Sequence, residues 1–331
     1  MGYHSASSMK LAQNEDALVE QIARQLGFAK SKTLAVGLGD DAALWTPTLG
    51  HQTVLTCDWF LEDSHFLRDK HPPDAVGWKC LARAISDVAA MGGKPRCFLL
   101  GLALPADLTG KWLDEFLRGL KRAAKVLGCP AAGGDTTLQS KVLISITVIG
   151  EVRPGRAILR SGAKPGDLIY VSGTLGEADL GLRQLRKQRG VARPSNAALR
   201  KHLYPEPRLA LGQWLAANRL ATAMMDISDG LSTDLPRLCA ASGVGARIEM
   251  ASLPVSLALP TAEAREFALH GGDDYEVLFT VTARNARRLP ATFHRVPLTR
   301  IGKITRERKI LLESEQKIEP LPSGGWDPFR F

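Results

Sequence analysis

Apolar residues in the first half of the chain alternate between a helical and a strand-like spacing. Leu18, Ile22 and Leu26 recur every four residues and predict a helix that ends at Gly27. Residues 142–150 are instead rich in β-branched side chains, which favours a strand. The patterns of this half predict helices over residues 15–27, 74–91 and 111–127, a short apolar run at 34–38, and strands over residues 53–56, 97–104 and 142–150.

The second half of the chain repeats this alternation. Its patterns predict strands over residues 168–172, 246–250 and 276–282, helices over residues 177–187 and 207–216, and a turn at 226–230 that opens another helix. Because strands and helices alternate in both halves, we expect a mixed α/β fold built from two sandwiches.

A segment rich in glycine, proline and arginine, residues 151–166, separates the two halves and marks a domain boundary. The chain has 331 residues, a length that suits about two domains. We therefore expect one domain at residues 13–152 and a second at residues 153–331. Residues 1–12 carry no motif.

The composition is that of a globular protein, with 45% hydrophobic and 23% charged residues. The five cysteines contain no C-x-x-C pair, so neither a zinc site nor a disulfide framework is indicated. The first twenty residues lack an apolar core of signal-peptide length, and no apolar run approaches the roughly 18 residues of a membrane span. We expect a cytoplasmic protein without a membrane partner.

The formal net charge of +9 raises the question of a nucleic-acid partner. Much of the excess lies in two runs, residues 183–193 and 306–309, which are typical of a helix end and of a turn beside a strand. Neither run has the interleaved aromatic residues of a single-strand binder. We therefore favour a basic solvated surface and expect no nucleic-acid partner.

Candidate chemistry comes from aspartates that lie beside glycines or at the ends of apolar runs. The set comprises Asp40, Asp41, Asp58, Asp87, Asp135, Asp226, Asp229, Asp273 and Asp274. Carboxylates that converge repel one another unless cations neutralise them, and hard divalent ions prefer such oxygen ligands. With no cluster of histidine or cysteine, the set favours Mg²⁺ and a nucleotide over zinc, and thus phosphoryl transfer.

Each aspartate taken singly also has an ordinary interpretation. Asp226 or Asp229 can cap the following helix, and Gly-Asp pairs form common turns. Asp87 differs, because it lies in a predicted buried helix between Ile85 and Val88, where a metal or an arginine must neutralise it.

The common phosphate-binding signatures are absent from the sequence. It has no G-x-x-x-x-G-K-[ST], no G-x-G-x-x-G opening a helix and no H-R-D loop, which excludes the common nucleotide folds but not nucleotide use. Glycine-rich backbone at 133–134 and 271–272, with Arg160 and Lys164, can still surround phosphates.

A series of motifs follows in a fixed order from about residue 15 to the end: GLGDDAAL (37–44), TCD (56–58), His65, AISDVAAMG (84–92), GGDTT (133–137), RSGAKPGD (160–167), DISDGLSTDL (226–235), GGDDYEVLFT (271–280) and GGWDPF (324–329). This order resembles that of the thiamine-monophosphate kinase family. GGDTT and the acidic strand ends are shared with the wider aminoimidazole ribonucleotide synthetase-like superfamily. RSGAKPGD, GGDDYE and GGWDPF point to the kinase family itself.

This resemblance implies an activity and an assembly. The activity is phosphorylation of thiamine monophosphate to thiamine diphosphate by ATP, with Mg²⁺, through direct in-line transfer without a covalent phosphoenzyme. The fold is the two-domain aminoimidazole ribonucleotide synthetase-like fold of a homodimer. Residues 13–152 bind ATP and Mg²⁺ and join their sheet to the partner's in a shared barrel, and residues 153–331 form an α/β sandwich that completes the sites. A need for K⁺ stays open.

The resemblance also implies roles for individual residues. Metal-binding positions match Asp41, Thr56, Asp58, Asp87, Asp135, Asp226 and Asp229, with Cys57 contributing through its backbone carbonyl. ATP-binding positions match Gly134, Asp135, Arg160 and Ser228, and thiamine-phosphate positions match His65, Asp273 and Trp326. Two residues depart from the family pattern: Cys57 replaces the usual hydroxyl residue, and Asp273 replaces the usual glutamate.

Two other functions stay open at this point. One is an ATP-using member of the same superfamily with a different acceptor. The chain lacks the amino-terminal cysteine or selenocysteine nucleophile of selenophosphate synthetase, and it ends in DPFRF without the terminal cysteine of the hydrogenase maturation dehydratase. The other is a non-catalytic nucleotide-binding or nucleic-acid-binding protein that keeps the fold. The intact acidic set argues against the latter, because converging carboxylates without a metal are destabilising.

Overall fold

The computed structural model describes residues 14–27, 31–256 and 263–329, so residues 1–12 lie outside the described part. The elements of the first half are α1 (Glu15–Leu26), β1 (Leu34–Val36), β2 (Leu44–Trp45), β3 (Gln52–Leu61), α2 (Pro73–Ala90), β4 (Lys94–Leu104), α3 (Lys111–Leu127), β5 (Ala131–Leu138) and β6 (Leu143–Val152). Those of the second half are β7 (Leu168–Ser172), α4 (Glu177–Lys187), α5 (Ala197–Leu203), α6 (Leu209–Ala217), β8 (Ala221–Ile227), α7 (Leu231–Ser242), β9 (Gly245–Glu249), α8 (Ala264–His270), β10 (Glu276–Val281), α9 (Ala283–Ala286), β11 (Thr292–Phe293), β12 (Val296–Thr305), β13 (Ile310–Glu313) and β14 (Ile318–Pro320).

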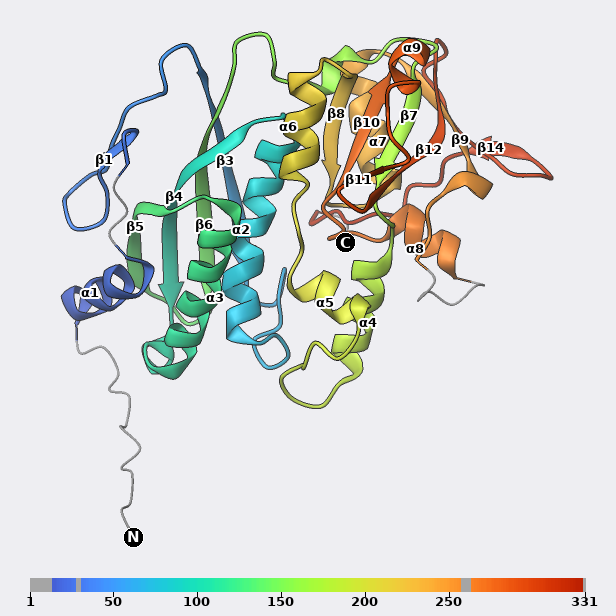
Figure 1. The fold of residues 1–331 in the computed structure, drawn as a ribbon. Coiled ribbons are helices and arrows are strands. Elements are labelled where there is room, and N and C mark those ends of the chain that lie inside the picture. Colours follow the sequence, from blue (N-terminus) through green and yellow to red (C-terminus); the bar gives the residue numbers. More distant parts are fainter. Residues whose placement is uncertain (1–13, 28–30, 257–262, 330–331) are drawn as a thin grey trace.

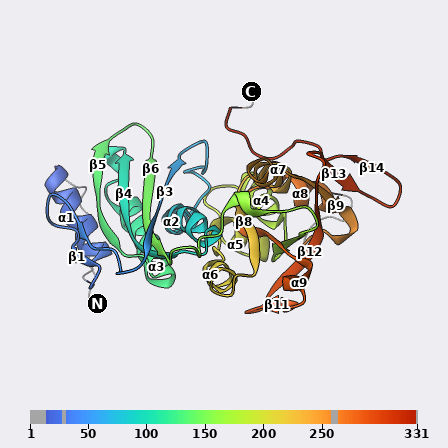
Figure 2. The same ribbon diagram turned by 90° about the horizontal axis from the view of Figure 1, so that it is seen from above.

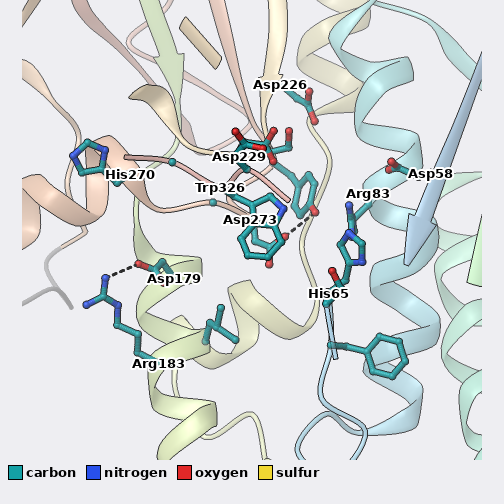
Figure 3. Close-up of a pocket in the computed structure, with 18 of the residues that line it drawn as sticks. Asp58, His65, Arg83, Asp179, Arg183, Asp226, Asp229, His270, Asp273 and Trp326 are labelled. Atoms are coloured by element: carbon teal, nitrogen blue, oxygen red, sulfur yellow. Dashed lines mark hydrogen bonds and ion pairs between the residues drawn. The ribbon is translucent and has the colours of Figure 1, made fainter. Parts of the chain in front are cut away.

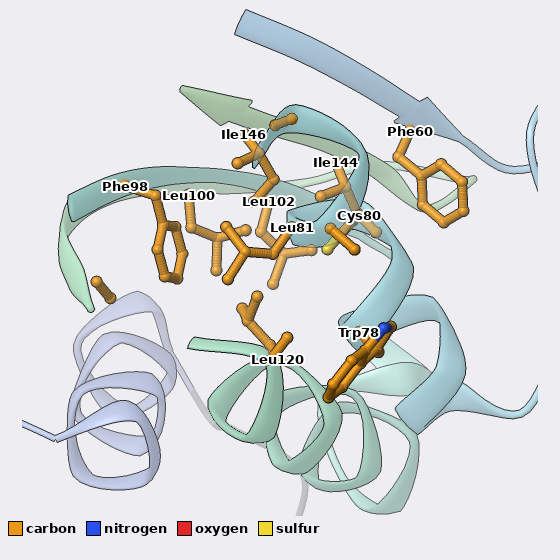
Figure 4. Packing of buried hydrophobic residues seen from close by; sticks show 14 of the residues in the cluster. Phe60, Trp78, Cys80, Leu81, Phe98, Leu100, Leu102, Leu120, Ile144 and Ile146 are labelled. Carbon is orange, nitrogen blue, oxygen red and sulfur yellow. The ribbon is translucent and has the colours of Figure 1, made fainter. Parts of the chain in front are cut away.

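The first half is a four-stranded sheet in the order β3-β6-β4-β5, with α2 and α3 packed on one face (Figure 1). Alternate residues of β6, such as Ile144 and Ile146, are buried under the helices because successive side chains of a strand point to opposite faces. They meet Leu81 of α2 and Leu120 of α3 in the core drawn in Figure 4. The helices therefore cover one face of this sheet.

The opposite face of the sheet, here called the outer face, is partly open. The β1–β2 ribbon covers one part of it near Cys97 and Ala132. Elsewhere Leu55 is 68% exposed and Trp59 is 57% exposed, both on β3. Apolar side chains of this size at such exposure are typical of a contact surface.

The second half has a longer sheet in the order β14-β13-β9-β12-β7-β10-β8, covered by helices on both faces. Every residue of β10 is buried, as expected for a central strand between two layers. Leu278 of this strand packs with Leu235 of α7, whereas Phe279 packs on the other side with Leu215 of α6. The mixed α/β architecture expected from the sequence is thus confirmed.

Helix α2 lies between the two halves and packs against both, as Figures 1 and 2 show. It contacts β6 of its own sheet and α6 and β8 of the second half. The indole Nε1 of Trp78 donates a hydrogen bond to the carbonyl oxygen of Pro205, 2.8 Å away. One side of this helix is therefore available to build a site shared by both halves.

Most of the predicted elements are confirmed to within a few residues, including α1 with Gly27 as its C-cap and α4 at residues 177–187. One prediction was wrong in extent. The strand predicted at 53–56 runs from Gln52 to Leu61, because all ten residues pair with β6, so Asp58 lies inside a strand instead of after one.

In the described ranges, no helix is long and apolar enough to span a membrane.

The glycine-rich backbone at 133–134 lies in β5, a strand that the sequence did not predict and that pairs in parallel with β4. Glycine has low strand propensity, but close packing requires it here. A Cβ on Gly134 would lie 1.9 Å from the carbonyl oxygen of Leu100. Helices α5, α8 and α9 and strands β2, β8 and β11–β14 were not predicted either.

Candidate functional site

A cavity of about 640 Å³, here called the central cleft, opens between the two halves (Figure 3). Its wall from the first half comes from β3, the loop after β3, and α2. The facing wall comes from α4, the end of β8, the loop before β10 and the segment around Trp326. Clefts between two packed units are common places for ligand sites.

Three charged residues of α2 face this region at intervals of four: Lys79, Arg83 and Asp87. Residues four apart lie on the same side of a helix. Asp87 and Arg83 line the central cleft, and Lys79 lies beneath its floor, where it pairs with a cleft carboxylate. Three consecutive turns of the helix thus carry two cations, Lys79 and Arg83, and one anion, Asp87.

Asp87 is only half buried, which differs from the full burial expected from the sequence. Its Oδ2 accepts a hydrogen bond of 2.5 Å from Oγ1 of Thr56 on β3. A hydroxyl therefore satisfies part of this carboxylate, where the sequence had suggested a metal or an arginine. The side chain keeps an oxygen for a ligand of the cleft.

Four carboxylates gather at one end of the cleft: Asp58, Asp87, Asp226 and Asp229. Burial raises the pKa of Asp58 above its ordinary value, and the negative charges of Asp87 and Asp229 add to this although Arg83 opposes it. Burial, followed by the charge of Asp87, raises the pKa of Asp226 in the same way. The cluster therefore repels itself and favours a bound cation.

The donor set of this cluster suits Mg²⁺ better than a softer metal, because it offers carboxylate oxygens. Among the residues that the structure describes, no group of three or more His, Cys, Asp or Glu side chains already has the spacing of a metal site. Mg²⁺ usually takes one or two protein carboxylates and completes its shell with waters and phosphates. The residues present fit an ion that arrives with a nucleotide.

The loop that precedes β10 supplies Asp273 to the opposite side of the cleft. Asp273 and Tyr275 have positive φ angles of 67° and 50°, a conformation that side chains rarely adopt. Hydrogen bonds hold the loop, from the backbone N of Asp273 to the oxygen of Ser228 and from that of Tyr275 to the oxygen of Ile227. Strained backbone of this kind is common at binding sites.

A buried cation determines the charge of Asp273. Nζ of Lys79 lies 2.8 Å from Oδ2 of Asp273, and the hydroxyl of Tyr275 donates to Oδ1 at 2.8 Å. Burial alone would raise the pKa of Asp273, but the Lys79 ammonium more than offsets this and holds it well below its usual range. The carboxylate is therefore ionised where it faces the cleft.

Two buried histidines extend this arrangement behind the cleft wall. Nζ of Lys79 lies 3.2 Å from Nδ1 of His202, whose Nε2 lies 3.1 Å from Nε2 of His71. Burial lowers the pKa of His71 to about 3 and that of His202 well below its ordinary value. Both rings are neutral at physiological pH, and they leave Lys79 as the cation of the group.

His65 lines the cleft below Arg83 in Figure 3. Its Nδ1 accepts a hydrogen bond of 3.1 Å from the backbone N of Leu61. Burial lowers the pKa of His65 to about 4, so the ring is neutral. With Nδ1 accepting, the proton of the neutral ring resides on Nε2, which leaves a donor for a ligand.

Trp326 lies at the rim of the cleft, and its side chain is 45% exposed. Its backbone N donates to the carbonyl oxygen of Asp229 at 2.9 Å. Asp229 is itself fixed, because Arg237 Nη1 lies 2.5 Å from its Oδ2 and Asp234 accepts from its backbone N. The turn after β8 therefore positions both a carboxylate and an aromatic ring.

The cleft brings together eight of the residues proposed from the sequence. They are Asp58, His65, Asp87, Asp226, Ser228, Asp229, Asp273 and Trp326. Thr56 joins them through its bond to Asp87. Their roles as ligands stay predictions.

The other five residues lie outside the central cleft: Asp41, Cys57, Gly134, Asp135 and Arg160. Asp41 and Arg160 are exposed. Cys57 is on the outer face, with Sγ 3.5 Å from Oγ of Ser145. Asp135 follows the same face, since Gly101 pairs with both Asp135 and Ser145 across the sheet.

Sequence reasoning missed Lys79, Arg83, His71 and His202. The available signal was the spacing of Lys79, Arg83 and Asp87 by four within an otherwise apolar helix, which places three charges on one side. No such signal existed for His202, because its contact with Lys79 joins residues 123 positions apart.

Comparison with known proteins adds a family context to this geometry. Residues 39–152 match the family described as AIR synthase related protein, N-terminal domain, and residues 164–313 match its C-terminal domain. The chain is 35% identical over 309 residues to the thiamine-monophosphate kinase of Bacillus subtilis strain 168, covering 89% of this chain and 94% of the relative. It is 40% identical over 294 residues to that of Escherichia coli K12, covering 86% and 89%.

A solved structure described as AaThiL complexed with AMPPCP and TMP has the same fold. It superposes with a TM-score of 0.75 at 33% identity, over 98% of this chain and 100% of the other. The similarity therefore extends over both walls of the central cleft.

Proposed function

This chain belongs to the thiamine-monophosphate kinase family, and we propose that its central cleft transfers a phosphoryl group from ATP to thiamine monophosphate. The resemblance that the motifs indicated is confirmed by relatives that match nearly the whole chain. The observation that carries the proposal is the composition of one cavity. Four carboxylates lie at one end, and an ionised Asp273, a neutral His65 and an exposed Trp326 face the remainder.

The carboxylate end would hold Mg²⁺ through Asp58, Asp87, Asp226 and Asp229, with Thr56 supporting Asp87. When bound, Mg²⁺ neutralises the charge of the phosphates during transfer. The contribution of the chain is to keep several carboxylates close together on rigid elements. Their mutual repulsion is relieved when cations enter with the nucleotide.

The other end of the cleft suits the thiamine part of the acceptor. The ring of Trp326 presents an aromatic face to a cationic thiazolium. Lys79 keeps Asp273 ionised, so this carboxylate accepts hydrogen bonds or faces positive charge. The Nε2–H of His65 supplies a donor. We assign no residue as a covalent nucleophile, in keeping with direct in-line transfer.

We further propose that the protein acts as a homodimer joined through the outer faces of its two N-terminal sheets. The exposed Leu55 and Trp59 support this, because burying them stabilises an assembly. Asp135 lies on the same face as Trp59, since both align with Ser145 and Gly101 across the strands. Gly134 and Asp135 then belong to an ATP site that borders the interface, with Arg160 as a further ATP-binding position and Asp41 as a metal-binding position.

The proposed location is the cytoplasm, which the five free cysteines support, because a reducing compartment keeps thiols reduced. ATP and thiamine monophosphate are the partners that the proposal names, together with the second copy of the chain.

The decisive experiment is a thiochrome fluorescence assay that separates thiamine diphosphate from thiamine monophosphate after incubation with ATP and Mg²⁺. We expect product formation that stops on chelation of the metal and returns when Mg²⁺ is added, and a titration with KCl tests whether K⁺ contributes. Nucleotide binding without thiamine diphosphate formation would contradict the proposal. Transfer to a different acceptor would favour another activity of the superfamily.

A further inference from the structure

Arg83 is an arginine in the central cleft whose charge has no ion-pair partner. In the described part of the chain, no carboxylate lies within ion-pair distance of its guanidinium, and its buried Nε has no hydrogen-bond partner. The guanidinium lies over the ring of Phe60, 5.2 Å from the centroid. A buried donor without a partner is costly unless a ligand completes its contacts.

The surroundings of Arg83 keep it charged. Burial would lower its pKa, but Tyr275, Asp58, Asp273 and Asp229 more than offset this and raise the pKa above the ordinary value. These groups act over a distance without forming ion pairs. The side chain therefore stands as a permanent cation between two groups of acids, and its planar donors suit a tetrahedral oxyanion.

Arg83 lies between the carboxylate end and the thiamine end of the cleft. In Figure 3 Arg83 lies between Asp58, at the carboxylate end, and His65, on the side of the thiamine positions. In the proposed reaction, the acceptor phosphate and the transferred phosphoryl group must both lie between the carboxylate end and the thiamine end of the cleft. Arg83 is the cationic residue that lies at this position.

The other arginines that line the cleft are engaged or exposed. Arg183 pairs with Asp179 at 3.1 Å and lies over the ring of Phe267. Arg186 is exposed at the outer end of α4. Neither has a buried donor without a partner among the described residues.

Building on the function proposed above, we propose that Arg83 binds the phosphate of thiamine monophosphate and thereby distinguishes this acceptor from unphosphorylated thiamine. The guanidinium would hold the acceptor phosphate oxygens by charge-assisted hydrogen bonds while Asp273 and Trp326 hold the thiamine part. Arg83 would then be a specificity residue of the acceptor site, added to the three positions that the family resemblance implies.

The test compares two ligands that differ only in the phosphate. Dissociation constants of thiamine monophosphate and thiamine are measured by calorimetry with Mg²⁺ and a non-hydrolysable ATP analogue, for the full chain and for Arg83→Gln. We expect Arg83→Gln to weaken thiamine monophosphate by about 10- to 100-fold, the range of a charged hydrogen bond, and to leave thiamine nearly unchanged. Arg122→Gln, at another arginine stacked on aromatic rings but outside the cleft, should change neither constant.

A second variant guards against loss of folding. Arg83→Lys keeps an aliphatic stem and a charge but not the planar pair of donors, so we expect a smaller loss of the preference for the phosphorylated ligand. Equal weakening of both ligands by Arg83→Gln and Arg83→Lys would overturn the proposal in favour of a packing role.

Three further outcomes have definite meanings. If either Arg83 variant weakens the ATP analogue and keeps the preference between the thiamine ligands, the arginine serves the nucleotide and the proposal is wrong. It is also wrong if Arg183→Gln, and not Arg83→Gln, removes the preference. If the unaltered chain binds neither thiamine ligand, the proposed function itself fails, and that result differs from a functioning kinase that is indifferent to Arg83.

Discussion

The ammonium of Lys79 lies 2.8 Å from the carboxylate of Asp273, and this ion pair joins α2 of the first half to the loop before β10 of the second. The Lys79 side chain is 1% exposed and that of Asp273 is 27% exposed. The cation is therefore enclosed in protein, whereas the anion faces the cleft. The pair both fastens the two halves and holds an ionised group at the surface of the site.

Removal of Lys79 should leave a carboxylate without its cation. We expect Lys79→Met to lower the free energy of unfolding by about 3 kcal/mol, the scale of a broken buried pair, and to raise the KM for thiamine monophosphate. The double variant Lys79→Met/Asp273→Asn should regain much of the stability but not the KM. Urea unfolding and steady-state kinetics measure the two effects.

The exposed pair of Lys141 and Asp63 provides a control, and Lys141→Met should leave the unfolding midpoint nearly unchanged. If the losses from Lys79→Met and Asp273→Asn simply add in the double variant, the two groups are not coupled.

Trp326 should contribute to binding of the acceptor and not to binding of ATP. We expect Trp326→Ala to raise the KM for thiamine monophosphate by about fivefold, since a cation–π contact at an exposed site is worth on the order of 1 kcal/mol. Trp326→Phe should lose less because it keeps an aromatic face. A rise in the KM for ATP with an unchanged KM for the acceptor would contradict this role.

Asp135 tests the part of the proposed nucleotide site that lies outside the central cleft. The side chain is exposed on β5, so Asp135→Asn should retain the fold, as judged by circular dichroism and the unfolding midpoint. We expect it to lose turnover at least 100-fold, the scale of a lost charge contact in a phosphoryl-transfer site. Unchanged activity would refute the metal and ATP assignment of this residue.

The open outer face predicts that a charge there separates the two copies. We expect Trp59→Glu to shift the sedimentation coefficient from that of a dimer to that of a monomer, because a carboxylate cannot be buried without a partner. Val126→Glu is the matched control, at an exposed apolar residue on α3, on the helical side of the same sheet. A monomeric unaltered chain would disprove the proposed assembly.

His71 predicts a pH dependence of stability. Burial lowers its pKa to about 3 in the folded chain, whereas in the unfolded chain it takes up a proton near pH 6.5. Between these values the unfolded chain binds more protons, so this histidine reduces the free energy of unfolding by about 1.4 kcal/mol per unit as pH falls below about 6.5.

We expect His71→Asn to have a shallower loss of stability than the unaltered chain between about pH 6 and pH 4.5. Urea unfolding at several pH values measures both slopes, and titrating groups distant from His71 cancel in their difference. Identical slopes would show that His71 is not held neutral in the folded state.

The sequence allowed the fold to be predicted where local patterns are strong, and not where distant pairing decides. Helix α4 was predicted at its observed bounds from apolar spacing after a glycine turn. The length of β3 could not be predicted, since Asp58 has low strand propensity and the ladder to β6 holds it in place. The same applies to β5, where close contact with β4 requires a glycine at position 134.

The candidate site shows the same difference between what local sequence patterns predict and what distant contacts decide. The aspartates singled out in the sequence include five that share the central cleft, and the family resemblance added His65, Ser228 and Trp326. Lys79 and Asp273 could not be paired from the sequence, because 194 positions separate them and no local sequence pattern at either residue indicates the other. The cations of the cleft became visible only in three dimensions.

Helix α2 sets the spacing of the charged side chains along the cleft. Lys79, Arg83 and Asp87 occupy successive turns and lie about 6 Å apart along the helix axis. One residue inserted between them would rotate everything beyond it by about 100° and turn one end of the cleft away from the other. A redesign of this protein therefore has to keep the nine residues from Lys79 to Asp87 without insertion or deletion.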